Sequence, residues 1–276
     1  MRRRLRPLIE RAQAHVAVAS QRFEDHLTAA IRDLPALPRI AQATDLLLGR
    51  QSLYLQQPSM FYFPGLPQRA FYEREEFAWV AGMEAMTARI GDELADVLAQ
   101  PTEFLPYVET PTDAPAPNNP LRNDPSWSAY YFWRGGAVVK DHAARCPTVM
   151  EALALAPMPI VTGRSPMALW SLLTPGTHIR PHNGLLNTRL ICHLPILTAP
   201  DCALRVGAET RPWRKGEMLV FDDSIEHEAW NRSDGTRVVL LFEIWRPEIA
   251  VEEREALTTL FEAIDRFGPG QMDTGG

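Results

Sequence analysis

Four of the seven histidines in this 276-residue chain fall between residues 178 and 227, and two of them, His182 and His227, are candidate metal ligands. Imidazole nitrogen binds iron, copper, zinc and nickel. The two residues are 45 positions apart, which places them on different strands if the segment forms β structure. The spacing alone favours hydrogen-bonded structural histidines over metal ligands.

This sequence lacks the third protein ligand that the common pattern of a non-haem iron site contains. That pattern is His-x-Asp/Glu followed by a distant histidine, but the second position after the first histidine is Gly184. Glu226 and Glu228 flank His227, and strand alternation turns them to the opposite face. Asp223 shares the side of His227 but lies in an apparent turn. The residues therefore predict two histidine ligands completed by water.

Arg237 opens the apolar segment 237–245 and is a candidate anchor for an anion. Strand alternation puts it on the same face as Glu243. A buried guanidinium needs a partner, and its planar shape matches a carboxylate through two hydrogen bonds. The residues leave two partners open, either a bound dicarboxylate that also reaches the metal or an acidic side chain of the protein.

A second polar strand face is formed by Arg189 and His193, which alternate with Cys192 on the other face. Two inward polar side chains on one strand favour a polar pocket over a plain core. Cys192 is then expected to be an inert packing thiol.

Short apolar segments separated by turn residues follow residue 168 and predict the strands that carry these side chains. Their succession favours an antiparallel sandwich or a double-stranded barrel of the jelly-roll kind, with flanking helices. The expected strands are residues 168–173, 187–194, 202–207, 216–221 and 237–245. The expected helices are residues 8–33, 73–98, 140–154, with an interruption at Pro147, and 251–267.

Apolar residues recur in these helices at spacings of three and four, which defines their buried faces. The stripe of the second helix is Val80, Met83, Ile90, Leu94 and Val97, and that of the last is Leu257, Leu260, Phe261 and Ile264. The segment 101–125 contains seven prolines, which excludes a helix or a central strand. We expect a loop that lies over the domain or over the mouth of the site, with an interdomain linker as the alternative.

Composition excludes several classes of protein. The net charge of −6 argues against a nucleic-acid binder. Three cysteines without a CxxC pair argue against a disulfide framework and predict a reducing, cytoplasmic location. No apolar run approaches the roughly 20 residues of a transmembrane helix, and no apolar stretch typical of a signal peptide follows the basic start.

Residues 1–50 are expected to form a helical extension to a second region of residues 51–276, which has its β core at about 127–248. The amphipathic helix within the extension has one apolar face. We interpret that face as a packing surface or a homodimer contact, with a membrane-surface helix as the alternative. The mixed charge signs on its polar face do not favour lipid.

The segment from about 127 to 248 resembles the aspartyl/asparaginyl β-hydroxylase family of iron(II)- and 2-oxoglutarate-dependent dioxygenases. The motifs that carry the resemblance are PGTHIRPHNG (175–184), RLICHLPI (189–196), WRKGEMLVFDDSIEHEAWN (213–231) and RVVLLFEIWRP (237–247). The resemblance implies a double-stranded β-helix fold. It also implies an iron(II) site made by His182 and His227 alone, so that Gly184 follows the family pattern.

The resemblance further implies that Arg237 anchors 2-oxoglutarate, with His193 and Ser171 in support, and that dioxygen is the other cosubstrate. Family members that act on aspartyl or asparaginyl side chains usually carry an arginine where this chain has Ile191. Arg189, on the same strand face, is the expected replacement for binding substrate.

The implied reaction is hydroxylation of an unactivated sp³ carbon in a small molecule, an amino acid, a peptide or a lipid. One expected target is the β-carbon of an aspartyl- or asparaginyl-type substrate. Three alternatives stay open: a halogenase, a lipid or acyl-chain hydroxylase, and a non-catalytic cupin-like module that binds a metal or a small acid. The aromatic stretches at 59–67 and 127–133 are compatible with an acyl chain.

Overall fold

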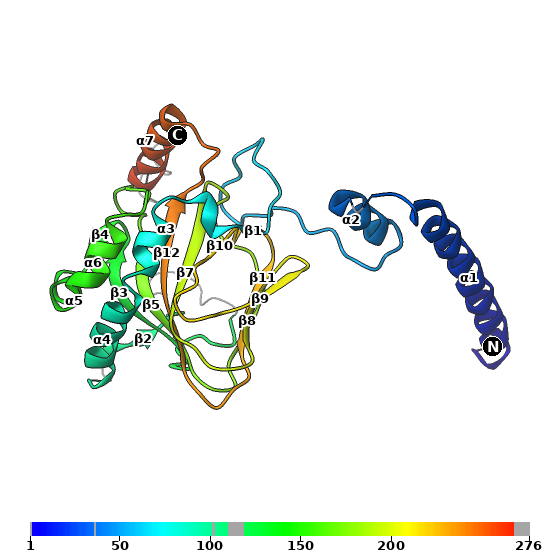
Figure 1. Cartoon of the computed structure of the whole chain (residues 1–276), viewed down its shortest axis with the longest axis horizontal. Coiled ribbons are helices and arrows are strands. Elements are labelled where there is room, and N and C mark those ends of the chain that lie inside the picture. The colour runs from blue at the N-terminus through cyan, green and yellow to red at the C-terminus, as the bar shows by residue number, and fades with distance from the viewer. Residues whose placement is uncertain (1, 36, 101–102, 110–118, 268–276) are drawn as a thin grey trace, which may run out of the picture. The chain divides into compact units, whose positions relative to one another are not determined.

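The computed structural model describes residues 2–35, 37–100, 103–109 and 119–267. The chain divides between Leu53 and Tyr54 into two compact units, and each is described by itself. Figure 1 labels the elements of both.

The first unit consists of two helices, α1 (Arg2–Ile31) and α2 (Pro38–Leu47). Arg50 forms ion pairs with Glu24 of α1 and Asp45 of α2, which tie the two helices together. Apolar side chains on the expected face of α1 are exposed to solvent, as shown by Val16 at 62%. The sequence predicted this helix correctly but began it too late.

The second unit is built on two antiparallel sheets. The larger has the order β1-β10-β7-β12-β5-β3-β2, with β4 paired to β3, and the smaller has the order β6-β11-β8-β9. The strands are β1 (Phe71–Tyr72), β2 (Leu105–Pro106), β3 (Trp127–Arg134), β4 (Ala137–Val138), β5 (Ala168–Leu173), β6 (His178–His182), β7 (Arg189–Leu197), β8 (Cys202–Val206), β9 (Glu209–Pro212), β10 (Leu219–Phe221), β11 (His227–Asn231) and β12 (Arg237–Trp245).

From β5 onward the chain passes back and forth between the sheets. Strands β5, β7, β10 and β12 belong to the larger sheet, and β6, β8, β9 and β11 belong to the smaller. Antiparallel strands that alternate in this way close two facing sheets into a jelly roll. The predicted double-stranded β-helix core with flanking helices is therefore confirmed.

Strand alternation divides the apolar side chains of the larger sheet into two packed layers. Leu240 and Phe242 of β12 belong to the outer layer, which also contains apolar residues of the covering helices. Val239 and Leu241 belong to the inner layer, together with Leu204 and other residues of the smaller sheet. The functional side chains predicted on the inner face consequently point between the sheets.

The outer face of the larger sheet is covered by short helices (Figure 1). They are η1 (Arg74–Glu76), α3 (Val80–Glu84), α4 (Thr87–Leu98), α5 (Lys140–Arg145) and α6 (Pro147–Leu153). The single helix predicted over 73–98 is wrong, because this segment forms three short pieces. Thr87 Oγ1 donates to the Glu84 carbonyl at 2.6 Å where α3 ends, a local bond that competes with helix continuation.

The predicted buried stripe of residues 73–98 is nevertheless correct. All five of its apolar side chains are buried against the larger sheet. The break between α3 and α4 therefore changes the direction of the chain without changing which side chains face the core.

The last helix, α7 (Val251–Arg266), buries a narrower stripe than the sequence predicted. Leu257 and Phe261 are buried, and Phe261 meets Phe61 edge to face at 5.1 Å. Leu260 and Ile264 are 44% and 46% exposed, so these two core assignments are wrong. No helix in the described part of the chain is long and apolar enough to span a bilayer.

Candidate active site

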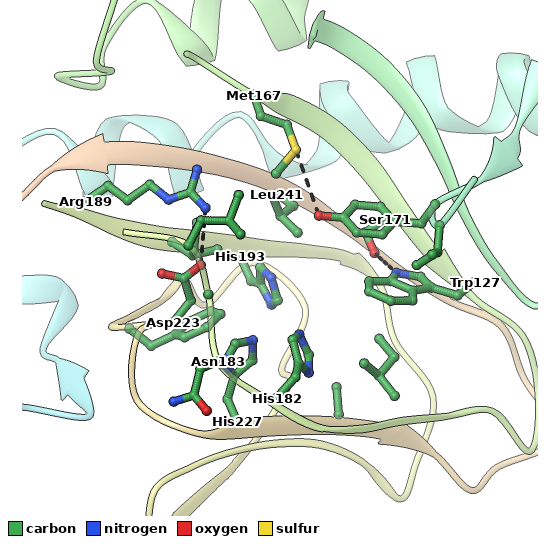
Figure 2. A pocket seen from close by; sticks show the side chains of 18 of the residues that line it. Trp127, Met167, Ser171, His182, Asn183, Arg189, His193, Asp223, His227 and Leu241 are labelled. Carbon is green, nitrogen blue, oxygen red and sulfur yellow. Dashed lines mark hydrogen bonds and ion pairs between the residues drawn. The ribbon is translucent and has the colours of Figure 1, made fainter. Parts of the chain in front are cut away.

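A cavity of about 470 Å³ lies between the two sheets of the second unit. Its walls come from the inner faces of β5, β7 and β12 on one side and of β6 and β11 on the other. Tyr107, Val108 and Asn119 also line it, so described parts of the proline-rich segment 101–125 reach the site. The cavity brings together all six predicted site residues: Ser171, His182, Arg189, His193, His227 and Arg237 (Figure 2, which labels all but Arg237).

The two candidate metal ligands face each other across adjacent strands. His182 and His227 are register partners in β6 and β11, and their ring centroids are 4.1 Å apart. His182 Nδ1 lies 2.8 Å from the Arg180 carbonyl, and His227 Nδ1 lies 3.1 Å from the Ile225 carbonyl. A carbonyl only accepts, so each Nδ1 carries the proton and each Nε2 keeps a free lone pair.

His227 is held in its neutral form. Burial lowers its pKa to about 3, and the neighbouring His182 acts in the same direction. A neutral imidazole with a free Nε2 is the form that binds a metal. Among the residues that the structure describes, no group of three histidine, cysteine or acidic side chains is arranged to hold a metal ion. The two histidines therefore form an open pair.

His178 belongs to a different cluster. Its Nε2 lies 2.7 Å from Glu228, which also pairs with Arg205. Glu226 contacts the same arginine. The two glutamates beside His227 are thus engaged by Arg205, in agreement with the prediction from strand alternation that they point away from the metal pair.

Asp223 fills the space beside Gly184. A Cβ built on Gly184 would lie 2.2 Å from Asp223 Oδ2, which is closer than real Cβ contacts allow. The backbone joins the same two residues, because Gly184 N donates to the Asp223 carbonyl at 2.7 Å. A protein side chain at position 184 is therefore incompatible with the observed position of the Asp223 carboxylate.

Arg237 is a buried cation without a carboxylate partner in the described part of the chain. Its side chain is 1% exposed, and its Nη1 donates to the carbonyl of Ser171 at 3.0 Å and to the hydroxyl at 3.4 Å. Its Nε has no hydrogen-bond partner among the described residues. Burial lowers the pKa of Arg237 to about 9. An uncompensated buried charge is costly, so this site favours an incoming anion.

His193 and Trp213 complete the surroundings of Arg237. The Trp213 ring lies under the guanidinium at 4.4 Å, and Trp213 Nε1 donates to His193 Nδ1 at 3.2 Å. Burial and the charge on Arg237 lower the pKa of His193 well below its usual value. Neutral His193 therefore carries its proton on Nε2 and can donate one hydrogen bond to a ligand.

Arg189 has two acidic partners of its own. Its Nη1 contacts Glu243, and its Nη2 lies 3.3 Å from Asp223 Oδ2. Glu243 is fully buried, and burial raises the pKa of Asp223 to about 6. Sequence reasoning assigned Arg189 to substrate, but it did not identify these two competing partners.

The turn that carries Asp223 is fixed by the preceding residue. Asp222 is fully buried and accepts from Arg246 Nη1 at 2.6 Å and from Gln56 Nε2 at 2.7 Å. It also accepts from Ser224 N at 3.0 Å. These bonds place both Asp223 and the start of β11, which carries His227.

Three residues of the site were not identified from the sequence. Trp213 gave no spacing signal, because it lies between strands. Asp223 was considered only as a metal ligand and set aside. Strand alternation placed Glu243 on the same inner face as Arg237. A buried acid on that face was a signal from which Glu243 could have been identified as part of the site.

Comparison with known proteins identifies the family of the chain. The family model described as aspartyl/asparaginyl beta-hydroxylase matches residues 84–247. The human aspartate beta-hydroxylase domain-containing protein 2 is 30% identical over 213 residues, which are 75% of this chain and 55% of that protein. The human aspartyl/asparaginyl beta-hydroxylase is 32% identical over 142 residues, which are 51% of this chain and 18% of that protein.

A bacterial relative is named for a lipid substrate. The ornithine lipid ester-linked acyl 2-hydroxylase of Rhizobium tropici is 30% identical over 179 residues, which are 64% of this chain and 60% of that protein. The chain thus spans about half the length of the first relatives that it matches. Since the family model covers more than half of the chain, the chain belongs to the aspartyl/asparaginyl β-hydroxylase family.

Proposed function

We propose that the chain is an iron(II)- and 2-oxoglutarate-dependent hydroxylase that acts on an sp³ carbon. The observation that carries the proposal is the combination, in one cavity, of two histidines with free Nε2 atoms and one buried arginine that has no acidic partner among the described residues. The first feature fits a metal, and the second fits the far carboxylate of a dicarboxylic acid.

The residues of the site have separate tasks in this proposal. His182 and His227 hold iron(II), and the carbonyls of Arg180 and Ile225 fix their tautomers. Bound there, iron(II) supplies the reaction in which substrate, 2-oxoglutarate and dioxygen give hydroxylated substrate, succinate and carbon dioxide. Two protein ligands leave open positions for the cosubstrates.

Arg237 receives the distal carboxylate of 2-oxoglutarate. Ser171 orients the guanidinium through its carbonyl and hydroxyl, and Trp127 Nε1 donates to that hydroxyl at 3.3 Å. Neutral His193 adds a donor next to the arginine. Four arginines line the cavity, and in the described part of the chain three of them have acidic partners, so Arg237 is the cation best placed to bind an anion.

The filled space beside Gly184 weighs against the halogenase alternative. A halide ligand needs room at the position that a carboxylate ligand otherwise takes. Here the Asp223 carboxylate occupies the volume next to Gly184, and its negative charge repels an anion. Hydroxylation fits this arrangement better.

A lipid or acyl-chain substrate is the second candidate. The relative from Rhizobium tropici, an ornithine lipid ester-linked acyl 2-hydroxylase, supports it. Apolar side chains form much of the cavity wall, and the segment that pairs with residues 184–186 presents Met60 at 58% exposed. An aspartyl- or asparaginyl-type substrate remains the first candidate, because the family model carries that name.

Metal binding and cosubstrate turnover test the proposal together. Iron(II) binding is measured anaerobically by equilibrium dialysis with the wild type, His182→Ala, His227→Ala and the matched control His178→Ala. We expect metal to be lost in the first two variants and kept in the control. Conversion of 2-oxoglutarate to succinate is then followed with peptide and acyl-lipid substrates. Metal binding without succinate formation would favour the cupin-like binding module.

A further inference from the structure

We propose that Glu243 and Asp223 make the Arg189 end of the cavity select against a carboxylate and in favour of an uncharged amide on the substrate. The inference rests on the proposed function, in which Arg237 serves the cosubstrate and the opposite end of the cavity serves the substrate.

The two polar ends of the cavity have opposite electrostatic character. Arg237 is a buried cation with no acidic partner among the described residues. Six positions further along β12, Glu243 is a fully buried acid. Strand residues advance by about 3.3 Å each, so the two α-carbons are about 20 Å apart. One strand thus provides an anion-accepting end and an anion-rejecting end.

Arg189 is electrostatically neutralised by its own protein. Its Nη1 pairs with Glu243 and its Nη2 with Asp223 Oδ2 at 3.3 Å, so both terminal nitrogens have carboxylate partners. The cluster contains two carboxylates and one guanidinium, so its formal charge is −1. A substrate carboxylate placed against this cluster meets like charge, which costs several kcal/mol in a buried interface.

Position 191 supplies no second cation to this cluster. Ile191 is the register partner of Glu243 across β7 and β12, and it is buried. Met167 N donates to Glu243 Oε1 at 3.1 Å, which satisfies the second carboxylate oxygen. The neighbours of Glu243 thus include an apolar side chain, a backbone amide, the arginine that it neutralises and Tyr107.

Two unpartnered atoms at this end define what it can bind. Arg189 Nε is a buried donor without an acceptor, and Asp223 Oδ1 is a buried acceptor without a donor, among the described residues. Both residues line the cavity, and Figure 2 shows the Arg189 guanidinium directed at the Asp223 carboxylate. Buried polar atoms require partners. An amide offers both an oxygen acceptor and an N–H donor, whereas a carboxylate offers only acceptors.

The test compares two probes that differ only in this group, hexanamide and hexanoate. Binding is measured by ligand-observed NMR titration of the full-length chain carrying Arg237→Gln, which removes the other anion site. We expect hexanamide to bind at least about tenfold more tightly than hexanoate, as expected when like charges face each other. Equal affinities, tighter binding of hexanoate, or no binding of hexanamide would overturn the proposal.

Removing one negative charge should shift this ratio toward the acid. Glu243→Gln in the same background keeps the acceptor for Met167 N but frees Arg189 from one carboxylate. Asp223→Asn is the second, independent variant. Either change should lower the amide-to-acid ratio about tenfold. The matched control is Glu226→Gln, which removes a carboxylate paired with Arg205 outside the cavity and should leave the ratio unchanged.

Failure of the amide preference can be distinguished from failure of the proposed hydroxylase function. The probe titrations contain neither iron nor 2-oxoglutarate, so they report on the Arg189 end alone. If the wild type fails to bind iron(II) with 2-oxoglutarate, the proposed function fails while the amide preference can still hold. If both Glu243→Gln and Asp223→Asn leave the ratio unchanged, the specificity assignment fails and the hydroxylase proposal stands.

Discussion

The carboxylate of Asp223 occupies the space that a side chain on Gly184 would fill, because a Cβ at position 184 would lie 2.2 Å from Asp223 Oδ2. Gly184 is the second residue after His182, at the position of the carboxylate ligand in the common iron triad. The absence of that ligand is therefore built into the packing. An acid is present nearby, but it comes from the turn before β11 and is bonded to Arg189.

This contact predicts that Gly184→Ala is destabilising. The added methyl group must displace a buried carboxylate, and overpacking of this kind costs about 1–3 kcal/mol. The free energy of unfolding, measured with urea, should fall by that amount. Gly91→Ala is the control, since its Cβ would meet only Ile196 at an ordinary 3.7 Å. If Gly184→Ala and Gly91→Ala change the free energy of unfolding equally, a side chain at position 184 and the observed Asp223 carboxylate do not exclude each other.

Arg237 predicts how 2-oxoglutarate binding depends on pH. Its folded pKa of about 9 lies below its ordinary value of 12.5, so between these values the unfolded chain binds more protons. The stability of the ligand-free protein should therefore rise with pH in that window. A bound carboxylate favours the charged arginine, so 2-oxoglutarate should bind more weakly as pH rises through about 9.

The measurement is the increase in Tm caused by millimolar 2-oxoglutarate without metal, at pH 8 and pH 10. Binding to the folded state raises Tm by mass action. We expect a smaller increase at pH 10. Arg237→Gln should remove the increase at pH 8, with an affinity loss of about 2–5 kcal/mol. An increase in Arg237→Gln as large as in the wild type would show that the anion binds elsewhere.

Substitution of Asp222 should strongly lower the free energy of unfolding. The Asp222 carboxylate and Arg246 are both fully buried and lie 2.6 Å apart, so Asp222→Ala removes the buried partner of Arg246 and leaves only the longer contact with Glu248 at 3.4 Å. Removing one partner of a buried pair costs about 3–5 kcal/mol. The control is Glu151→Ala at the exposed pair with Arg89, where about 0–1 kcal/mol is expected. Similar losses in urea unfolding for both variants would contradict the assignment of Asp222 as the buried support of this turn.

Much of the fold could be predicted because periodicity reports which face of an element is buried. Alternation in 237–245 correctly separated Leu240 and Phe242 from Val239 and Leu241. The strands β6 and β9 were not predicted, because they are short and have mostly exposed side chains, as in His178–His182. The helix break near Thr87 was also missed, since it depends on one side-chain bond to a carbonyl.

The candidate site could be predicted in part for a related reason. Side-chain type and parity indicated His182, His193 and Arg237, and the structure brings all three into one cavity. The partners of Arg189 were not predicted, because Glu243 and Asp223 come from different segments that meet only in the folded barrel. Parity shows which face a residue occupies but not which neighbour it contacts across the sheet.

The central claim is that His182 and His227 hold iron(II) and Arg237 binds 2-oxoglutarate beside it. The most direct measurement is anaerobic titration of the protein with both, followed by the visible metal-to-ligand charge-transfer absorption of the complex. We predict a band in the wild type and in His178→Ala, no band in His182→Ala or His227→Ala, and a band that needs much more 2-oxoglutarate in Arg237→Gln. A folded wild-type protein that binds iron(II) and gives no band, or a band that survives both histidine substitutions, would contradict the claim.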